Sequence, residues 1–419
     1  VVGCGDMSGD VFGNGMLLSK TIKLVAAFDH RHIFLDPDPD EAKSWAERAR
    51  LFALPRSSWA DYDASLISKG GGIFPRNQKS IPLSPEIRAV LDIADETLDP
   101  SSLISAILKS PADLIWFGGI GTYIKGASEA NAQVGDPAND AHRVNGGELR
   151  ARVIGEGANL GVTQAGRIDF ALKGGRINTD FIDNSAGVDC SDNEVNIKIA
   201  LAAAKRAGRL SEPARVKLLS SMTDAVAHLV LEDNRLQALG LSIAEAGGAG
   251  ATGSYLRLME MLEERGGLDR KTEGLADNDT FKRRAAEGRG LTRPELAVLL
   301  SSAKLALQDA LEHSALPDDP GLDDELVAAF PEAMQGKFRK DILSHRLRRE
   351  IIATKLANRM VNRIGMIHPF ELVEEEGAGL AQVAAAFLVA ERLFGMDEVW
   401  QRIETAPMPE HARLIAFRR

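Results

Sequence analysis

Cysteine is almost absent from this chain, which contains only Cys4 and Cys190 among its 419 residues. Two cysteines so far apart form neither a disulfide framework nor the closely spaced ligand pairs of a zinc site. We therefore predict a protein of a reducing compartment, the cytoplasm, with no bound metal. Long hydrophobic runs and a signal-peptide pattern are also lacking, so we predict no membrane partner.

A surplus of basic residues is lacking too, because 50 Lys and Arg face 60 Asp and Glu, for a formal net charge of -10. No strongly basic segment stands out, so we predict no nucleic-acid partner. The length of 419 residues suffices for two or three domains with ample cores. The chain opens without methionine and only two residues before its first glycine, so we expect a piece of a longer polypeptide.

The opening stretch, residues 1–15, has the layout of a dinucleotide-binding turn between a strand and a helix. Gly3 permits a tight turn, and Gly5 allows the backbone to approach a pyrophosphate. Ser8 and Gly9 are small, although the third glycine arrives one position later than in the usual pattern. We expect cofactor contacts from Gly3, Gly5, Met7, Ser8 and Gly9. A glycine-rich turn without a ligand is the alternative.

Asp29 follows a second apolar segment, residues 23–28, which predicts a buried strand. An acidic residue about 20 positions after the glycine turn binds the adenosine ribose in dinucleotide-binding folds. A carboxylate there favours NAD and repels the additional phosphate of NADP. Two alternatives stay open: Asp29 is only a turn residue at a strand end, or the basic residues at 30–32 receive a phosphate.

Further strands are predicted over residues 112–117 and 152–156, and residues 174–188 follow the same plan. The first leads into Gly118 and Gly119, the second ends at Glu156 and Gly157, and we expect these four residues to contact the cofactor. Glycines at the carboxyl ends of parallel strands line the crevice in which open α/β sheets bind ligands. Strands alternating with helices predict a doubly wound, mostly parallel, Rossmann-like NAD-binding domain over residues 1–193.

The pattern changes after Asn193, and residues 194–419 predict an all-α domain. Thr292 and Glu295 form a capping box at a helix start. The apolar stripe from Ile342 to Ile364 predicts one amphipathic helix. The glycine-rich segment 247–253 lacks a preceding strand, which favours a flexible connection over a phosphate-binding loop.

A run of alternating acidic residues near position 38 could suggest a calcium loop, but that loop's glycine is missing. Asp38 as N-cap with Pro39 as the first helical residue explains the run better. We therefore predict a helix start here.

Three segments give the chain a resemblance to the glutamate dehydrogenase superfamily: the opening turn, residues 156–159 (Glu-Gly-Ala-Asn) and residues 184–191 (Asn-Ser-Ala-Gly-Val-Asp-Cys-Ser). The longer segments 5–15 and 155–163 resemble the very large bacterial NAD-specific glutamate dehydrogenases. Those enzymes have a helical C-terminal extension, which the second half of this chain would represent. The resemblance implies that Asn159 and Asn184 face the cofactor and that Ser191 lies near the substrate side chain. Ser185 and Ala186 depart from the family's alanine and glycine.

The function that this resemblance implies is NAD-dependent oxidative deamination of L-glutamate to 2-oxoglutarate and ammonia. In that family the catalytic lysine and aspartate belong to a substrate domain that precedes the nucleotide domain. We therefore assign no catalytic residue here, interpret Lys125 and Lys173 as surface charges, and expect the chain to be inactive alone. We also expect the full-length protein to be a homo-oligomer. The alternatives are another amino-acid dehydrogenase and a non-catalytic regulatory or oligomerisation portion.

Overall fold

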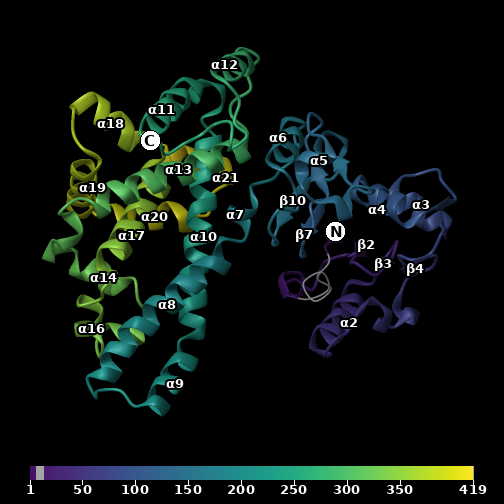
Figure 1. The fold of residues 1–419 in the computed structure, drawn as a ribbon, viewed down its shortest axis with the longest axis horizontal. Helices are drawn as coiled ribbons and strands as arrows, with labels where there is room; N and C mark the ends of the chain where they lie inside the picture. Colours follow the sequence, from purple (N-terminus) through teal and green to yellow (C-terminus); the bar gives the residue numbers. More distant parts are fainter. Residues whose placement is uncertain (6–13, 419) are drawn as a thin grey trace. The chain divides into compact units, whose positions relative to one another are not determined.

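The structure is a computed structural model that describes residues 1–5 and 14–418. It divides into two compact units, Val1–Asn184 and Ser185–Arg419 (Figure 1). The boundary that we predict after residue 193 lies inside helix α8 (Ser185–Arg206), nine residues beyond the division between the units. Met7, Ser8 and Gly9, three of the predicted cofactor contacts, lie outside the described residues.

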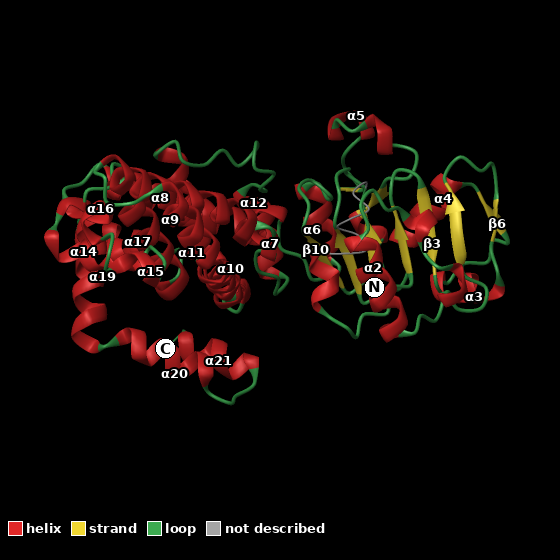
Figure 2. Ribbon diagram, turned by 90° about the horizontal axis from the view of Figure 1, so that it is seen from below, coloured by secondary structure: helices red, strands yellow, loops and turns green. Residues whose placement is uncertain are grey.

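A six-stranded mixed sheet organises the first unit, in the order β10-β7-β1-β2-β3-β4 (Figure 2). The strands β10, β7, β1 and β2 are parallel, whereas β3 and β4 pair antiparallel at one edge. Their bounds are β1 (Val2–Cys4), β2 (Ala26–Phe28), β3 (His32–Leu35), β4 (Gly72–Pro75), β7 (Leu114–Phe117) and β10 (Val153–Glu156). The strand cores predicted within 23–28, 112–117 and 152–156 are therefore confirmed, and the antiparallel edge is an addition.

The strand-like plan that we predict for residues 174–188 is wrong. That segment makes one isolated bridge, Arg176 to Val153, and then enters helices α7 (Asp180–Asp183) and α8. The carboxylates of Asp180 and Asp183 accept backbone N–H groups of Leu160 and Glu156 instead of lying in a strand. Short polar side chains that bond to the backbone favour such turns and helix starts over strands.

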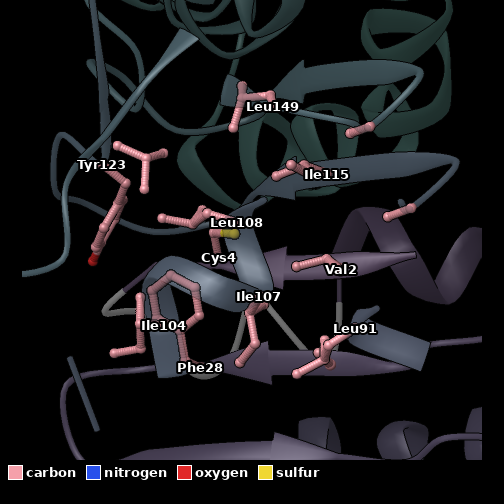
Figure 3. Close-up of a cluster of buried hydrophobic side chains, with 14 of the residues drawn as sticks. Val2, Cys4, Phe28, Leu91, Ile104, Ile107, Leu108, Ile115, Tyr123 and Leu149 are labelled. Carbon is pink, nitrogen blue, oxygen red and sulfur yellow. The ribbon is translucent and has the colours of Figure 1, made fainter. Parts of the chain in front are cut away.

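Both faces of the sheet are buried. Successive residues of each strand point to opposite sides, and the residues on each side belong to a hydrophobic core. Val2, Cys4 and Phe28 belong to one core, whereas Ala27 and Phe34 belong to the other. Figure 3 shows Ile107 and Leu108 of helix α4 (Pro100–Leu108) beside β1 in the first core. Near-continuous apolar runs such as 24–28 are what two-sided burial requires.

Helices and short strands complete the first unit. The remaining elements are η1 (Asn14–Leu18), α2 (Glu41–Ala53), η2 (Trp59–Asp61), η3 (Ala64–Leu66), β5 (Ile81–Pro82), α3 (Pro85–Leu91), β6 (Thr97–Leu98), β8 (Ile124–Lys125), α5 (Asn131–Val134), η4 (Pro137–Asn139), β9 (Val144–Asn145), η5 (Gly146–Glu148) and α6 (Gln164–Leu172). The predicted helix near residue 41 exists, but its N-cap is Asp40, which accepts the Lys43 N–H at 2.9 Å, and not Asp38.

The second unit is built from helices throughout its described residues. After α8 they are α9 (Glu212–Ser221), α10 (Thr223–Glu245), η6 (Gly248–Ala251), α11 (Thr252–Glu264), α12 (Asn278–Ala286), α13 (Arg293–Glu312), η7 (Leu316–Asp318), η8 (Pro320–Leu322), α14 (Asp323–Ala328), α15 (Glu332–Gln335), α16 (Arg339–Leu343), α17 (Arg348–Ile364), α18 (His368–Glu376), α19 (Leu380–Phe394), α20 (Met396–Thr405) and α21 (Glu410–Phe417). The helix-rich character predicted for residues 194–419 is thus confirmed.

Two details of this unit differ from the sequence-based picture. The predicted single helix from Ile342 to Ile364 is two helices, α16 and α17, separated where the His345 ring accepts the Leu347 N–H at 3.1 Å. The segment 247–253 is not a flexible connection, because it forms η6 and the first turn of α11. The capping box at Thr292 is present as predicted.

No single helix within residues 14–418 is both long and apolar enough to cross a membrane. Helices α18 and α19, which meet at a bend of 113°, reach that length and composition only when they are taken together.

Candidate functional site

The carboxyl ends of the parallel strands form the edge at which the predicted cofactor residues gather. Strand β2 follows β1 on one side, while β7 and β10 lie on the other side, so the direction of strand addition reverses beside β1. In open α/β sheets such a reversal opens a crevice between neighbouring loops. Gly5 follows β1 here, Gly118 follows β7, and Gly157 follows β10.

Gly5 and Gly119 touch each other at this edge. Gly5 has a φ of +134°, and a Cβ added to it would lie 2.3 Å from the Gly119 Cα and N atoms. The Gly118 N–H donates to the Cys4 carbonyl at 2.8 Å and ties the two loops together. A side chain at Gly5 would therefore clash with backbone, so glycine is required there for packing, independently of any ligand.

The indole of Trp116 explains three further glycines. Cβ atoms added to Gly15, Gly155 and Gly157 would lie 3.2, 2.9 and 2.5 Å from its ring. The ring thus packs against the start of η1 and against the exit of β10 at the same time. Sequence reasoning treated Trp116 only as part of a buried strand; the available signal was the glycine content of the segments beside it.

Glu156 is fully buried, and its carboxylate faces Arg167 of α6. The Arg167 guanidinium donates to both carboxylate oxygens at 2.7 and 2.8 Å, and it also pairs with Asp180 at 3.0 Å. Burial raises the pKa of Glu156 to about 7, and the charge of Arg167 opposes that rise. Both oxygens are occupied, so this side chain positions the loop that follows β10.

The structure brings Asn159 and Asn184, the two asparagines predicted to face the cofactor, into contact with each other. The Asn184 Nδ2 donates to the Asn159 Oδ1 at 2.5 Å, and Asn159 is exposed. Amide side chains of this kind offer both donors and acceptors to a polar ligand. They are held by the short helix α7, whose Asp183 carboxylate binds the Glu156 N–H at 2.9 Å.

Two large apolar side chains stand exposed on the same loops. Ile120 is 64% exposed after β7, and Leu160 is 66% exposed after β10. Leu160 has a φ of +60°, and its backbone is held by the Asp180 carboxylate and the Thr122 hydroxyl. A β-carbon-bearing residue in that conformation costs free energy, so the surroundings must impose it. Sequence reasoning missed both residues, and only the fold reveals their exposure.

Asp29 lies at the end of β2, where the ribose contact is predicted, but its side chain is fully buried. Its Oδ1 accepts the N–H groups of Arg31 and His32 at 2.7 Å each, which caps the turn into β3. Its Oδ2 has no hydrogen-bond partner among the described residues. One oxygen therefore has the structural role that the alternative interpretation proposes, and the other keeps acceptor capacity.

The remaining candidate residues are distributed as follows. Ser191 is exposed on α8 and belongs to the second unit. The Lys125 Nζ donates to the Asn145 Oδ1 at 2.7 Å, and Lys173 donates to the Gly147 carbonyl. Within the described residues, His, Cys, Asp and Glu form no group of three or more that could hold a metal ion. The described part of this edge thus offers backbone groups, amides and apolar surface, which suit binding more than proton transfer.

Two protein-family models match the chain. Residues 1–244 match the model for the bacterial NAD-glutamate dehydrogenase catalytic domain, and residues 288–409 match the model for the glutamate dehydrogenase C-terminal region. The first match covers more than half of the chain. This chain belongs to the bacterial NAD-glutamate dehydrogenase family. The family's catalytic-domain segment ends in α10, so it includes the first helices of the second unit as well as the sheet.

Curated relatives agree with this membership. NAD-specific glutamate dehydrogenases of Mycobacterium tuberculosis, Pseudomonas aeruginosa and Halomonas elongata are 50%, 51% and 49% identical to the chain over 98%, 96% and 96% of its length. The chain spans about a quarter of the length of these relatives, namely 26%, 25% and 25%. The resemblance carried by the opening turn and by residues 156–159 and 184–191 is therefore confirmed.

Proposed function

We propose that this chain is the NAD-binding portion of an enzyme for the oxidative deamination of L-glutamate to 2-oxoglutarate and ammonia. One combined observation carries the proposal. A reversal of strand order brings Gly5, Gly119 and the Asn159–Asn184 pair to one edge, in a chain about half identical to NAD-specific glutamate dehydrogenases. The first unit would then act as a Rossmann-like nucleotide domain, and the catalytic lysine and aspartate would lie in polypeptide outside this chain.

The residues at the carboxyl edge fit a dinucleotide. Gly5, Gly118 and Gly119 are buried and let the loops after β1 and β7 pack closely, at the strand ends where a pyrophosphate is bound in such folds. Asn159, two residues after Gly157, forms with Asn184 an amide pair suited to a carboxamide or a ribose hydroxyl. The cofactor supplies hydride transfer, whereas this chain's residues hold and orient it.

Asp29 is proposed to bind the adenosine ribose through its Oδ2, the carboxylate oxygen without a partner among the described residues; because this oxygen is buried, the proposal requires the backbone around it to open when the cofactor binds. Because Oδ1 caps a turn, replacing Asp29 with alanine would damage the fold as well as the site. The isosteric Asp29→Asn keeps an acceptor oxygen and removes the charge. We expect this variant to have a lower ratio of NADH affinity to NADPH affinity. The reason is that the carboxylate charge that repels the additional phosphate of NADPH is gone.

Three further assignments are proposals for the whole protein. Ser191 on α8 is proposed to face the substrate side chain, where its hydroxyl suits a carboxylate. The exposed Val389, Leu393 and Phe394 of α19 support a homo-oligomer, because solvated apolar faces commonly mark interfaces. Both cysteines are free, which supports a cytoplasmic location.

The decisive experiment is a calorimetric titration of the 419-residue chain with NADH and, separately, with NADPH. We expect NADH to bind and NADPH to bind at least about tenfold more weakly, a difference of about 1.4 kcal/mol. Asn159→Ala should weaken NADH binding several-fold while the chain stays folded, and Gln78→Ala, an exposed amide between β4 and β5, serves as its control. Absence of NADH binding by a folded chain would refute the proposal for this portion.

A further inference from the structure

A cavity of the first unit lies at the opposite edge of the sheet, where the strands begin. It measures about 810 Å³ and is lined by residues that immediately precede β7 and β10, together with the turn after α6. Asp113 precedes β7, and Arg152 precedes β10. The loops of the proposed cofactor edge follow these same strands, so the cavity and that edge are at opposite ends of parallel strands.

The lining of this cavity is strongly basic. Arg150, Arg152, Lys173 and Arg176 contribute four cationic side chains, against the single carboxylate of Asp113. The chain as a whole carries a formal net charge of -10, so the cations are concentrated here against the overall charge balance. A concave surface with one sign of charge attracts counter-ions of the opposite sign.

Two of the four cations are held in place by the fold. The Arg150 Nε donates to the Lys109 carbonyl at 2.7 Å, and its guanidinium also pairs with Asp92. Lys173 donates to the Gly147 carbonyl. These contacts use part of each cation's donor capacity and fix its charge at the cavity wall, which lowers the ordering cost of binding an anion.

The other two cations are available for a ligand. The Arg152 side chain is 80% exposed and makes a 3.3 Å contact with the equally exposed Asp113, a weak surface ion pair. Arg176 is exposed, and in the described part of the chain its guanidinium forms no ion pair or hydrogen bond. A planar guanidinium can bind two oxygens of one phosphate or carboxylate group at once.

The cavity also has an apolar wall and a bare turn. Val153, which is 37% exposed, lines the cavity together with buried Leu149 and Phe170. Gly174 has a φ of +94°, and a Cβ on Gly175 would lie 2.3 Å from the Phe170 ring, so this turn must be glycine and places no side chain over the cavity. Apolar surface beside anchored cations suits a ligand with a ring as well as an anionic group.

We propose that this cavity binds a small polyvalent anion of nucleotide size, with its phosphate groups on Arg152 and Arg176 and its apolar part on Val153. The volume of about 810 Å³ falls within the range of small-molecule sites, about 300–1,000 Å³. The site is separate from the proposed cofactor edge, so it does not depend on the proposed function.

Calorimetric titration of the 419-residue chain with inorganic tripolyphosphate and, separately, with ATP tests the proposal. The key variant is Arg176→Glu, because in the described part of the chain the Arg176 guanidinium forms no ion pair or hydrogen bond that the change would remove. Arg152→Glu is the second variant. Lys79→Glu is the matched control, because Lys79 is exposed in the same unit and undergoes the same change of charge. NADH is titrated into the chain with and without saturating tripolyphosphate.

We expect Arg176→Glu and Arg152→Glu each to weaken tripolyphosphate binding by about tenfold, and Lys79→Glu by less than about twofold. We expect ATP to bind more tightly than tripolyphosphate, because its base can contact the apolar wall, and equal affinities would overturn the assignment of an apolar ligand part to Val153. Equal losses in all three variants, competition between tripolyphosphate and NADH, or no tripolyphosphate binding by the unmodified chain would each overturn the proposal. Because NADH is titrated separately, a failure here is distinguishable from a failure of the proposed function.

Discussion

The structure requires glycine at position 5 for two reasons, its backbone conformation and its close contact with Gly119. Its φ of +134° is unfavourable for residues with a side chain, and the Gly119 backbone occupies the space that a Cβ would need. A substitution at Gly5 that is designed to block a cofactor therefore also perturbs the contact between the β1 and β7 loops. Binding data on such a variant are informative only beside a stability measurement.

We predict that Gly5→Ala lowers the free energy of unfolding of the first unit by about 2–5 kcal/mol, from backbone strain and overpacking. Urea unfolding followed by tryptophan fluorescence measures it. The control is Gly147→Ala, where a Cβ meets nothing within 4 Å, and its stability should stay within about 1 kcal/mol of the unmodified chain. Equal stability of the two variants would contradict the prediction.

Lys304 is a buried cation of the helical unit. Its Nζ donates to the Gln237 Oε1 at 2.8 Å, and burial lowers the pKa of its ammonium group to about 7. An unfolded lysine has a pKa of about 10.4, so between pH 7 and 10.4 the unfolded chain binds more protons than the folded chain. This group's contribution to the free energy of unfolding therefore rises with pH across that window.

We predict that Lys304→Met stabilises the helical unit by about 1–3 kcal/mol at pH 6, because it removes a desolvated charge, and that the gain shrinks toward pH 9 and above. Urea unfolding followed by circular dichroism at both pH values measures this. Lys282→Met on α12 is the control, because Lys282 is exposed and should show little change. A gain that stayed constant with pH would exclude the ionisation of Lys304 as its source.

At the level of elements, Glu156 and Arg167 join β10 to α6. Removing only the arginine would leave the Glu156 carboxylate buried with no compensating cation of comparable geometry. We predict that Arg167→Met destabilises the first unit by about 3–5 kcal/mol at pH 8. Because Arg167 opposes the rise in the pKa of Glu156, its removal raises that pKa further, so the variant takes up a proton at higher pH and the loss should diminish as the pH falls toward 7.

The matched variant for this prediction is the double change Arg167→Met with Glu156→Gln. It removes the buried charge together with its partner, so much of the lost stability should return. Urea unfolding of the single and double variants at pH 6 and pH 8 completes the measurement. A double variant no more stable than Arg167→Met would show that the pair contributes through shape and not through charge.

At the level of the whole molecule, each unit has its own core and can respond separately to a ligand. Trp45, Trp59 and Trp116 belong to the first unit, whereas Trp400 belongs to the second. Tryptophan fluorescence therefore reports mainly on the α/β unit, and far-ultraviolet circular dichroism mainly on the helical unit.

We predict that NADH at 100 times its dissociation constant stabilises the fluorescence-detected transition by about 2.7 kcal/mol and leaves the helical transition almost unchanged. An equal shift of both transitions would show that the cofactor or the fold couples the two units. NADPH at the same concentration provides the control ligand.

Local patterns in the sequence determined much of this protein. The apolar runs around residues 26, 115 and 154 predict the buried parallel strands, and the loss of such runs after Asn193 predicts the helical unit. The segments 156–159 and 184–191 identify the family and predict that Asn159 and Asn184 face the cofactor. Each of these features is carried by neighbouring residues, so it can be read without knowing the fold.

Only the tertiary structure decided which groups at the candidate site are free. Gly5 faces Gly119, Trp116 packs on three glycines, Glu156 is occupied by Arg167, and one oxygen of Asp29 caps a turn. The break between α16 and α17 and the helical start at Asp180 likewise depend on side chains that bond to the backbone. These contacts depend on how elements pack, and packing brings together residues whose spacing along the chain carries no sign of it.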